Sequence, residues 1–244
     1  MGAPAVAGGV ESRCGIRMND LEMNDLEKKT LLRCVGLSAF VGLLLLVSGG
    51  PGFRYGLSYW IVFTLATLAI MLYFLQHDPE LVERRLSATG EKDERQQLIR
   101  GCLNLAIMLL LVTAGIDHRM NWSDVSATVA AVALAVVALG FAVIFLTFQA
   151  NSHAGATIDV DPDQPVAQTG PYALVRHPMY LGIALILLAT PFALGSEWAF
   201  PWALAAVACL VWRLTEEERY LSGRLPGYDA YRRHIRYRLI PYVW

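Results

Sequence analysis

Apolar residues along the chain gather into six blocks that are free or nearly free of charge, with polar residues confined between them. An α-helix needs roughly 20 apolar residues to cross about 30 Å of hydrocarbon, and most of the blocks are close to that length or longer. The blocks are Leu31–Gly50, Leu57–Gln76, Gly101–Ile116, Val125–Ala150, Pro178–Ser196 and Trp198–Trp212. The pattern predicts an all-α, polytopic integral membrane protein with about six transmembrane helices.

Two of the blocks are shorter than a full membrane span, so the sequence leaves open whether they cross the membrane. Gly101–Ile116 does not establish by itself that it crosses the membrane. Trp198–Trp212 can continue through Arg213 toward Leu221, because a basic side chain near the end of a span reaches the interface. The last two blocks then form a helical hairpin, followed by a polar tail.

The blocks divide the chain into three regions. Residues 1–30 lack an apolar signal-peptide core and are predicted to be a cytosolic, disordered lead-in. Residues 31–147 are expected to hold transmembrane helices 1–4, with an amphipathic interfacial helix near residues 78–100, for which a plain cytosolic connector is the alternative. Residues 148–244 hold a loop, the hairpin and the tail.

Composition and charge support a membrane protein and argue against nucleic acid as a partner. The chain is 55% hydrophobic and only 17% charged, whereas a soluble domain carries about 25% charged residues. Its net charge of -1 gives no basic surface for phosphates. Lys and Arg gather before residue 34, in loop 76–100 and in the tail, so the positive-inside rule places both termini and the loops 76–100 and 151–177 in the cytoplasm.

Several familiar sites are missing from the sequence. No GxGxxG or GxxxxGK[ST] motif is present, so a dinucleotide or P-loop site is not expected. Asp159, Asp161 and Asp163 imitate the start of a calcium loop, but Gln164 stands where that loop needs glycine. The histidines have no paired ligand spacing, so no metal site is predicted.

Polar chemistry concentrates first in the segment TGPYALVRHPMYLG, residues 169–182. Gly170 and Pro171 favour a turn, and Pro178 is suited to the first position of a helix. His177 and Tyr180 are thus expected at a helix N-terminus, where free backbone N–H groups suit an anion. An ordinary loop-to-helix junction is the alternative.

The second segment is WRLTEEERYL, residues 212–221, followed by LPGYDAY. If the last helix continues through it, Arg213 and Glu217 lie four residues apart on one face, where the helix leaves the bilayer. The alternative is a weak exposed ion pair, with Tyr228 and Tyr231 as interface anchors.

The order GPYxxxRHPxYxG, then RxxxEExxL, GY, Y and IP resembles the isoprenylcysteine carboxyl methyltransferase family and related bacterial membrane and phospholipid methyltransferases. The resemblance covers roughly residues 148–244. It implies that S-adenosyl-L-methionine binds between the histidine loop and the C-terminal segment, and that a lipophilic acceptor enters from the membrane.

The resemblance also implies roles for individual residues. Arg213 matches the arginine assigned to the acceptor, as a catalytic and substrate-binding residue. The positions that match cofactor contacts are Gln164, Pro165, Val166, Ala167, Tyr172, His177, Pro178, Met179, Tyr180 and Glu217. The spacing from Leu221 to Tyr228 is shorter than the commoner family pattern, which leaves the roles of Gly227, Tyr228 and Tyr231 open, and Arg176 either meets the cofactor or shapes the loop.

The resemblance implies carboxyl O-methylation of an isoprenylcysteine-like acceptor. A carboxylate is already ionised at neutral pH, so this reaction needs no base. A phospholipid N-methyltransferase is one alternative, and it would need a base such as His177 or Glu218. A small-thiol S-methyltransferase is another. A non-catalytic membrane scaffold or carrier is the alternative of a different class. Pro191 and Pro201 interrupt the hairpin, and transporters often have short spans interrupted by proline.

Overall fold

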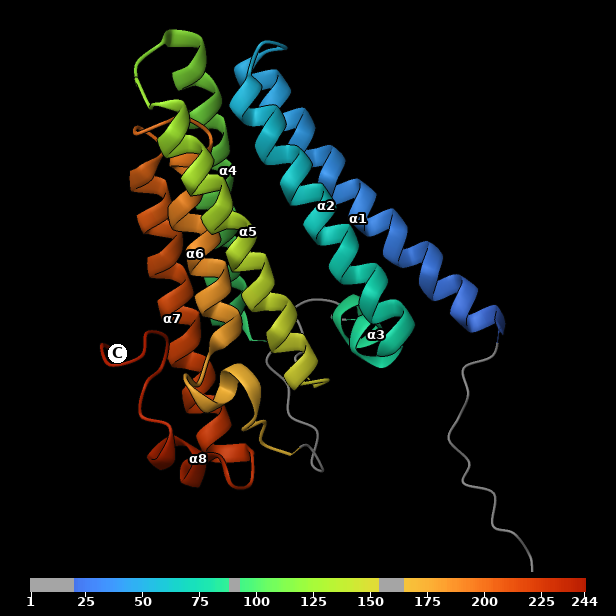
Figure 1. Ribbon diagram of the computed structural model, residues 1–244. Coiled ribbons are helices and arrows are strands. Elements are labelled where there is room, and N and C mark those ends of the chain that lie inside the picture. Colours follow the sequence, from blue (N-terminus) through green and yellow to red (C-terminus); the bar gives the residue numbers. More distant parts are fainter. Residues whose placement is uncertain (1–19, 88–92, 154–164) are drawn as a thin grey trace, which may run out of the picture.

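The computed structural model describes residues 20–87, 93–153 and 165–244, and within these ranges the chain is helical with no strand. Long helices lie side by side, and short ones gather at one end (Figure 1). The elements are α1 (Asp20–Gly49), α2 (Arg54–His77), α3 (Pro79–Ser87), α4 (Glu94–Met120), α5 (Ala127–Ala150), the 3-10 helix η1 (Gly170–Ala173), α6 (Pro178–Ala193), α7 (Phe200–Arg224) and α8 (Tyr228–His234). The all-α prediction is confirmed. We call the end with α3, η1 and α8 the α8 end, and the other the loop end.

In the described part of the chain, α1, α2, α4 and α5 are long and apolar enough to cross a membrane. The short block Gly101–Ile116 lies inside α4, whose 27 residues extend about 40 Å. With 16 residues α6 extends only about 24 Å, less than the hydrocarbon core. As predicted, α7 continues past Arg213, and its second half is charged. The helices support a polytopic membrane protein in which four of the six expected spans qualify by length and composition alone.

Two boundaries differ from the prediction. Residues 20–30, expected to be disordered, belong to α1, where Leu26 is buried against α2 and α3 and Lys29 pairs with Asp25 at 2.6 Å. The interfacial helix expected near residues 78–100 is the shorter α3. Residues 94–100 instead begin α4, because the Asp93 side chain accepts a hydrogen bond from the Arg95 N–H and caps that helix. Residues 1–19 of the lead-in lie outside the described residues.

Two glycines bring α5 and α6 into close contact. A Cβ on Gly182 would lie 2.7 Å from the Gly140 carbonyl oxygen, and a Cβ on Gly140 would lie 2.7 Å from that of Gly182. Only glycine at both positions allows this approach, as in small-residue contacts between membrane helices. The contact fixes the first turns of α6 beside the middle of α5.

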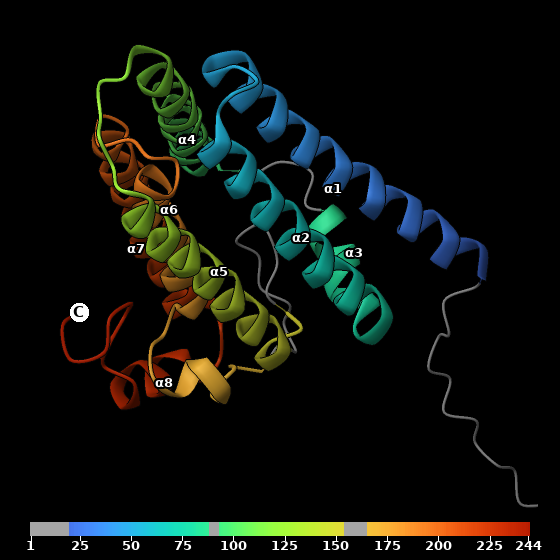
Figure 2. The ribbon, with the colours of Figure 1, turned by 45° about the horizontal axis from the view of Figure 1, so that its top comes forward.

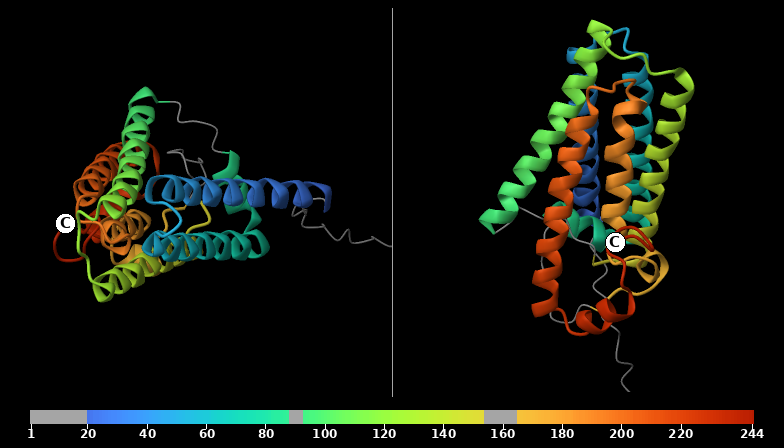
Figure 3. Two further views of the ribbon diagram at one scale, coloured as in Figure 1. Left: turned by 90° about the horizontal axis from the view of Figure 1, so that it is seen from above. Right: turned by 90° about the vertical axis from the view of Figure 1, so that its left-hand side faces the viewer.

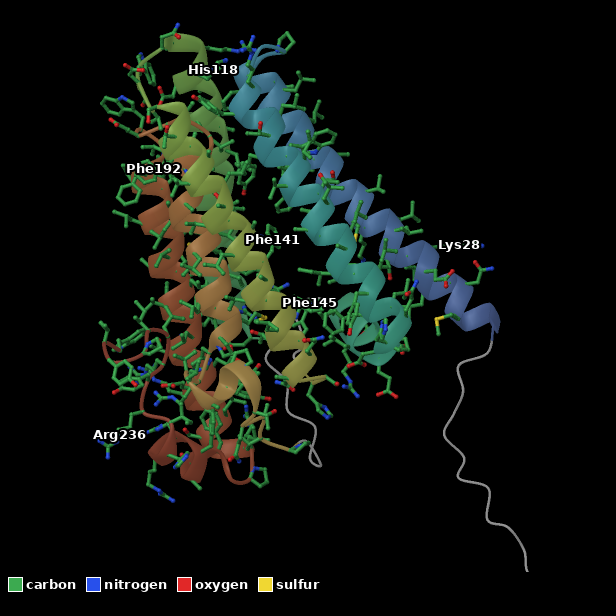
Figure 4. All side chains as sticks on the ribbon, viewed as in Figure 1. Lys28, His118, Phe141, Phe145, Phe192 and Arg236 are labelled. Carbon is green, nitrogen blue, oxygen red and sulfur yellow. The ribbon has the colours of Figure 1, made fainter. Side chains whose placement is uncertain are left out.

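The pair α1 and α2 packs on the rest of the bundle at an angle. Aromatic residues of α5 lie toward α2 (Figure 4), where Phe141 contacts Phe63 at 5.8 Å and Phe145 contacts Phe74 at 5.4 Å between ring centres. At the loop end α1 and α4 are so close that a Cβ on Gly115 would meet the Ser48 side chain. Toward the α8 end the same two helices diverge (Figures 2 and 3).

A buried carboxylate holds the loop end together. Asp117 accepts hydrogen bonds from the Ser123 N–H at 2.9 Å, from the Ser123 hydroxyl at 2.6 Å and from the Ser196 hydroxyl. These donors come from the connections after α4 and after α6. The network therefore fixes the two loops to each other.

Candidate functional site

The two segments singled out in the sequence meet at the α8 end. The backbone N–H of Arg176 donates to the Tyr237 carbonyl at 2.9 Å, and that of His177 donates to the Arg238 carbonyl at 3.0 Å. This short pairing attaches the loop before α6 to the tail after α8. Pro178 is the first residue of α6, as the sequence predicts.

Glu218 of α7 is the centre of a buried ionic network. Its Oε1 accepts from Arg176 Nε at 2.7 Å and lies 3.2 Å from His177 Nε2, and its Oε2 accepts from Arg238 Nε at 2.8 Å. Burial by itself raises the pKa of Glu218, but the hydrogen bonds and positive charge of His177 and Arg176 outweigh it and lower the pKa to about 2. The carboxylate therefore stays ionised and ties three segments together.

Arg176 has the contacts of a residue that shapes the loop. Its Nη1 donates to the carbonyls of Ile235 at 3.0 Å and Arg236 at 2.9 Å, in addition to the bond with Glu218. Arg236 itself extends outward at the α8 end (Figure 4). Of the two roles open for Arg176, these contacts favour holding the histidine loop against the tail.

A second polar group is formed by Tyr180, Glu217 and Arg213, and Glu217 directly precedes Glu218 in α7. The Tyr180 hydroxyl donates to Glu217 Oε2 and accepts from Arg213 Nε at 3.2 Å. Arg213 Nη1 also donates to Gln96 Oε1 of α4 at 3.4 Å. The hydroxyl of Tyr180 thus bridges the arginine and the glutamate that the sequence placed on one face of α7.

The remaining predicted cofactor residues lie around this centre. Tyr172 of η1 accepts from Asn151 Nδ2 at 3.2 Å through its hydroxyl, and its carbonyl accepts from the Tyr231 hydroxyl at 2.8 Å. Val166 packs on the cluster formed by Leu225, Tyr228 and Tyr231. Pro165 and Ala167 flank Val166 in the same loop. Gln164 lies outside the described residues.

Sequence reasoning missed residues that reach the site from other helices and from the tail after α8. Arg85 of α3 lies over the Phe148 ring, 4.4 Å from its centre, and its Nη1 is 3.9 Å from Met179 Sδ. Burial lowers the pKa of Arg85 to about 10, which leaves the side chain charged at neutral pH. Gln96 and Arg238 are the other two, and neither stands in a motif. The signal for Arg85 was the apolar pair Leu81 and Val82, which is buried and turns α3 toward the bundle.

One polar atom in this region is unsatisfied. The Tyr228 hydroxyl is buried and has no hydrogen-bond partner among the described residues. Nearly all buried polar atoms are paired, so an orphaned hydroxyl near carboxylates and an arginine fits a site that receives a polar ligand. The Glu217 carboxylate could hold a cationic group of such a ligand, and the N–H groups at the start of α6 could hold a carboxylate.

No metal-binding cluster occurs in the ranges that the structure describes: no three His, Cys, Asp or Glu side chains there are placed to hold an ion. Glu218, Glu217 and His177 instead have arginine, tyrosine or each other as neighbours.

The comparisons with known proteins point to membrane methyltransferases. No curated protein matches the chain. The matching family belongs to the same membrane methyltransferase superfamily as the isoprenylcysteine enzymes. The match covers nearly all of α5, the loop with η1, and all of α6 and α7, so it contains both segments that form the site. Residues 128–225 match the model of the family described as phospholipid methyltransferase.

Proposed function

We propose that this protein is an S-adenosyl-L-methionine-dependent methyltransferase that acts on a lipophilic acceptor embedded in the membrane. The observation that supports it most is the Tyr180 hydroxyl, which joins Arg213 to Glu217 directly beside the histidine loop. The family match over residues 128–225 supports the same reaction class. We place the site on the cytoplasmic side, because the segments at the α8 end carry most of the Lys and Arg residues.

For the acceptor we propose a carboxylate of an isoprenylcysteine-like molecule. An amine acceptor must lose a proton, and the two bases that the sequence offered, His177 and Glu218, are hydrogen-bonded to each other. Glu218 is in addition held by two arginines, and its lowered pKa makes it a weak base. A carboxylate avoids this need, since it is the nucleophile in its ionised form.

Phospholipid N-methylation is the second candidate, and the description of the matching family favours it. In that case the amine would pass its proton to Glu217, whose carboxylate accepts a hydrogen bond from the Tyr180 hydroxyl. The two candidates therefore differ in the protonation state that the acceptor needs and not in the architecture of the site.

The bound cofactor supplies an electrophilic methyl group on a sulfonium, and the chain's contribution is alignment and electrostatics. Arg213 holds the acceptor carboxylate and fixes the direction of its attacking oxygen. Glu217 holds the cationic part of the cofactor one helical turn away. Tyr180 sets the distance between the two side chains, while the apolar surroundings exclude water and strengthen both interactions.

Transfer of a radiolabelled methyl group tests this proposal. Detergent-purified protein is incubated with labelled S-adenosyl-L-methionine and either N-acetyl-S-farnesylcysteine or phosphatidylethanolamine. We expect a base-labile methyl ester from the first and no turnover of the second. Methylation of phosphatidylethanolamine alone would replace the carboxylate with the amine, and the absence of product from both would contradict the proposal.

The role of Arg213 is tested in the same assay. We expect Arg213→Ala to lose about a hundredfold in turnover, as for removal of one preorganised donor, with cofactor binding retained. Arg219→Ala is the matched control, because Arg219 lies on the same helix but is exposed and pairs only with Glu216 among the described contacts. Equal losses in both variants would remove Arg213 from the mechanism.

A further inference from the structure

An apolar groove opens on the side of the bundle where α1 and α4 diverge. It has a volume of about 670 Å³, within the range of pockets that take drug-sized ligands. Its floor is buried and comes from several helices, with Val41, Tyr59, Leu111 and Leu187 among the residues that form it. The groove is therefore a depression between helices and not a gap between two lipid-facing surfaces.

The rim of the groove faces the surrounding lipid. Phe40 of α1 is 54% exposed, and Leu105 and Met108 of α4 are also exposed. The deep end is closed by Thr190 and Tyr59, whose hydroxyls are 3.1 Å apart. A hydrocarbon chain can thus enter sideways from the bilayer between the exposed apolar side chains of the rim.

One face of α4 connects the groove with the candidate active site. Gln96, Arg100, Asn104 and Met108 follow one another at four-residue intervals, so they lie on one stripe of the helix. Gln96 accepts a hydrogen bond from Arg213, while Asn104 and Met108 line the groove. From Gln96 to Met108 the stripe rises about 18 Å, some three fifths of the hydrocarbon thickness.

The stripe changes from polar to apolar at Asn104. Asn104 is exposed within a span, where a polar side chain facing lipid is unfavourable. An amphiphilic ligand has the same order of polarity, with a charged head beside Arg213 and a chain beyond Asn104. The stripe and the groove together match such a molecule from end to end.

We propose that the groove between α1, α2, α4 and α6 binds the hydrocarbon chain of the methyl acceptor while its charged head lies at Arg213. This inference rests on the proposed function for the identity of the occupant. It makes the length of the chain a determinant of specificity. It also assigns a role to helices outside the matched residues 128–225, since α1, α2 and α4 supply most of the lining.

The experiment uses N-acetyl-S-farnesylcysteine with a photoreactive diazirine at the end of its chain, added to the full-length protein in detergent. We expect the label in residues 104–111 of α4 and 37–41 of α1. Met108→Trp and Asn104→Trp should each lower labelling by about tenfold, because the indole fills the groove. Leu43→Trp is the matched control, since Leu43 is exposed on α1 but lines a separate depression between α1 and α2.

Three outcomes would overturn the groove assignment. One is a label spread evenly over the lipid-facing helices, and another is labelling that Met108→Trp leaves unchanged. The third is displacement by phosphatidylcholine as effective as by unlabelled farnesylcysteine, because the groove would then be a general lipid site. Failure of the proposed function is distinguishable, since it would abolish methyl transfer and binding of S-adenosyl-L-methionine while the label still enters the groove.

Discussion

Two buried carboxylates occupy opposite ends of the bundle, and their surroundings differ. Asp117 at the loop end accepts from hydroxyl and backbone N–H groups, which are neutral. Glu218 at the α8 end has two arginines and a histidine as partners. Both are almost completely buried, yet only Glu218 gathers positive charge around it.

The difference indicates what each end is built for. The donors to Asp117 come from two neighbouring loops, and the network closes on itself. Beside Glu218 lies a second polar group of Tyr180, Glu217 and Arg213, and the Tyr228 hydroxyl remains without a partner in the described part of the chain. A closed network holds loops together, whereas an incomplete one marks a place where a polar ligand completes it.

The largest expected effect is loss of Glu218. Glu218→Ala leaves Arg176 and Arg238 as buried or half-buried charges without their carboxylate, which costs about 3–5 kcal/mol of folding free energy. The measurement is thermal unfolding of the detergent-purified protein. Glu216→Ala is the control, because its arginine partners are exposed. A change no larger than that of the control would show that the ionic network does not hold the α8 end.

Acid should weaken the same end selectively. The pKa of Glu218 is lowered to about 2 in the folded protein, so its contribution is complete above the ordinary glutamate pKa near 4.3 and is lost as the pH falls toward 2. The expected loss is about 3 kcal/mol over that interval, at about 1.4 kcal/mol per pKa unit. Unfolding measured against pH should show a shallower acid dependence in Glu218→Gln. An unchanged slope would contradict the lowered pKa.

Asp117→Asn should have a smaller effect and leave chemistry intact. The amide keeps one acceptor and most of the shape but can no longer accept from all three donors, so we expect a loss of about 1–3 kcal/mol. Methyl transfer per folded molecule should equal that of the wild type. A selective loss of turnover would break the division between a structural end and a functional end.

The smallest expected effect concerns the orphaned hydroxyl. Tyr228→Phe removes a buried polar atom that has no partner in the described residues, so the folding free energy should stay equal or rise. Affinity for S-adenosyl-L-methionine should fall about tenfold, the value of one typical hydrogen bond. Tyr231→Phe is the contrasting variant, because it loses the bond to the Tyr172 carbonyl and should be destabilised. Unchanged affinity in Tyr228→Phe would mean that the hydroxyl does not face the cofactor.

Local sequence signals predicted the elements that position the site. Pro178 begins α6, and α7 continues through Arg213 as its interfacial position suggested. The placement of Arg213 and Glu217 on one face followed from helical spacing alone. The helicity of residues 20–30 was not predictable in this way, because Leu26 depends on contacts with α2 and α3.

Other parts of the site depend on contacts between segments far apart in the chain. Glu218 meets His177 and Arg238 only after the hairpin closes and the tail folds back. Arg85 reaches Met179 because α3 is turned by its buried Leu81 and Val82, and the partner of Arg85 lies 94 residues away in the chain. The roles of these residues therefore depend on the partners that they meet in the folded protein, and the sequence around each residue does not specify those partners.

Calorimetric titration of the detergent-purified protein with S-adenosyl-L-methionine tests the central claim most directly. Wild-type protein should show saturable binding, and Glu217→Ala should bind at least about tenfold more weakly because it loses a charged partner of the cofactor. Glu216→Ala, the neighbouring carboxylate that pairs with exposed arginines, should bind like the wild type. Absence of binding in folded wild-type protein, or equal binding by Glu217→Ala, would contradict a methyltransferase site at the α8 end.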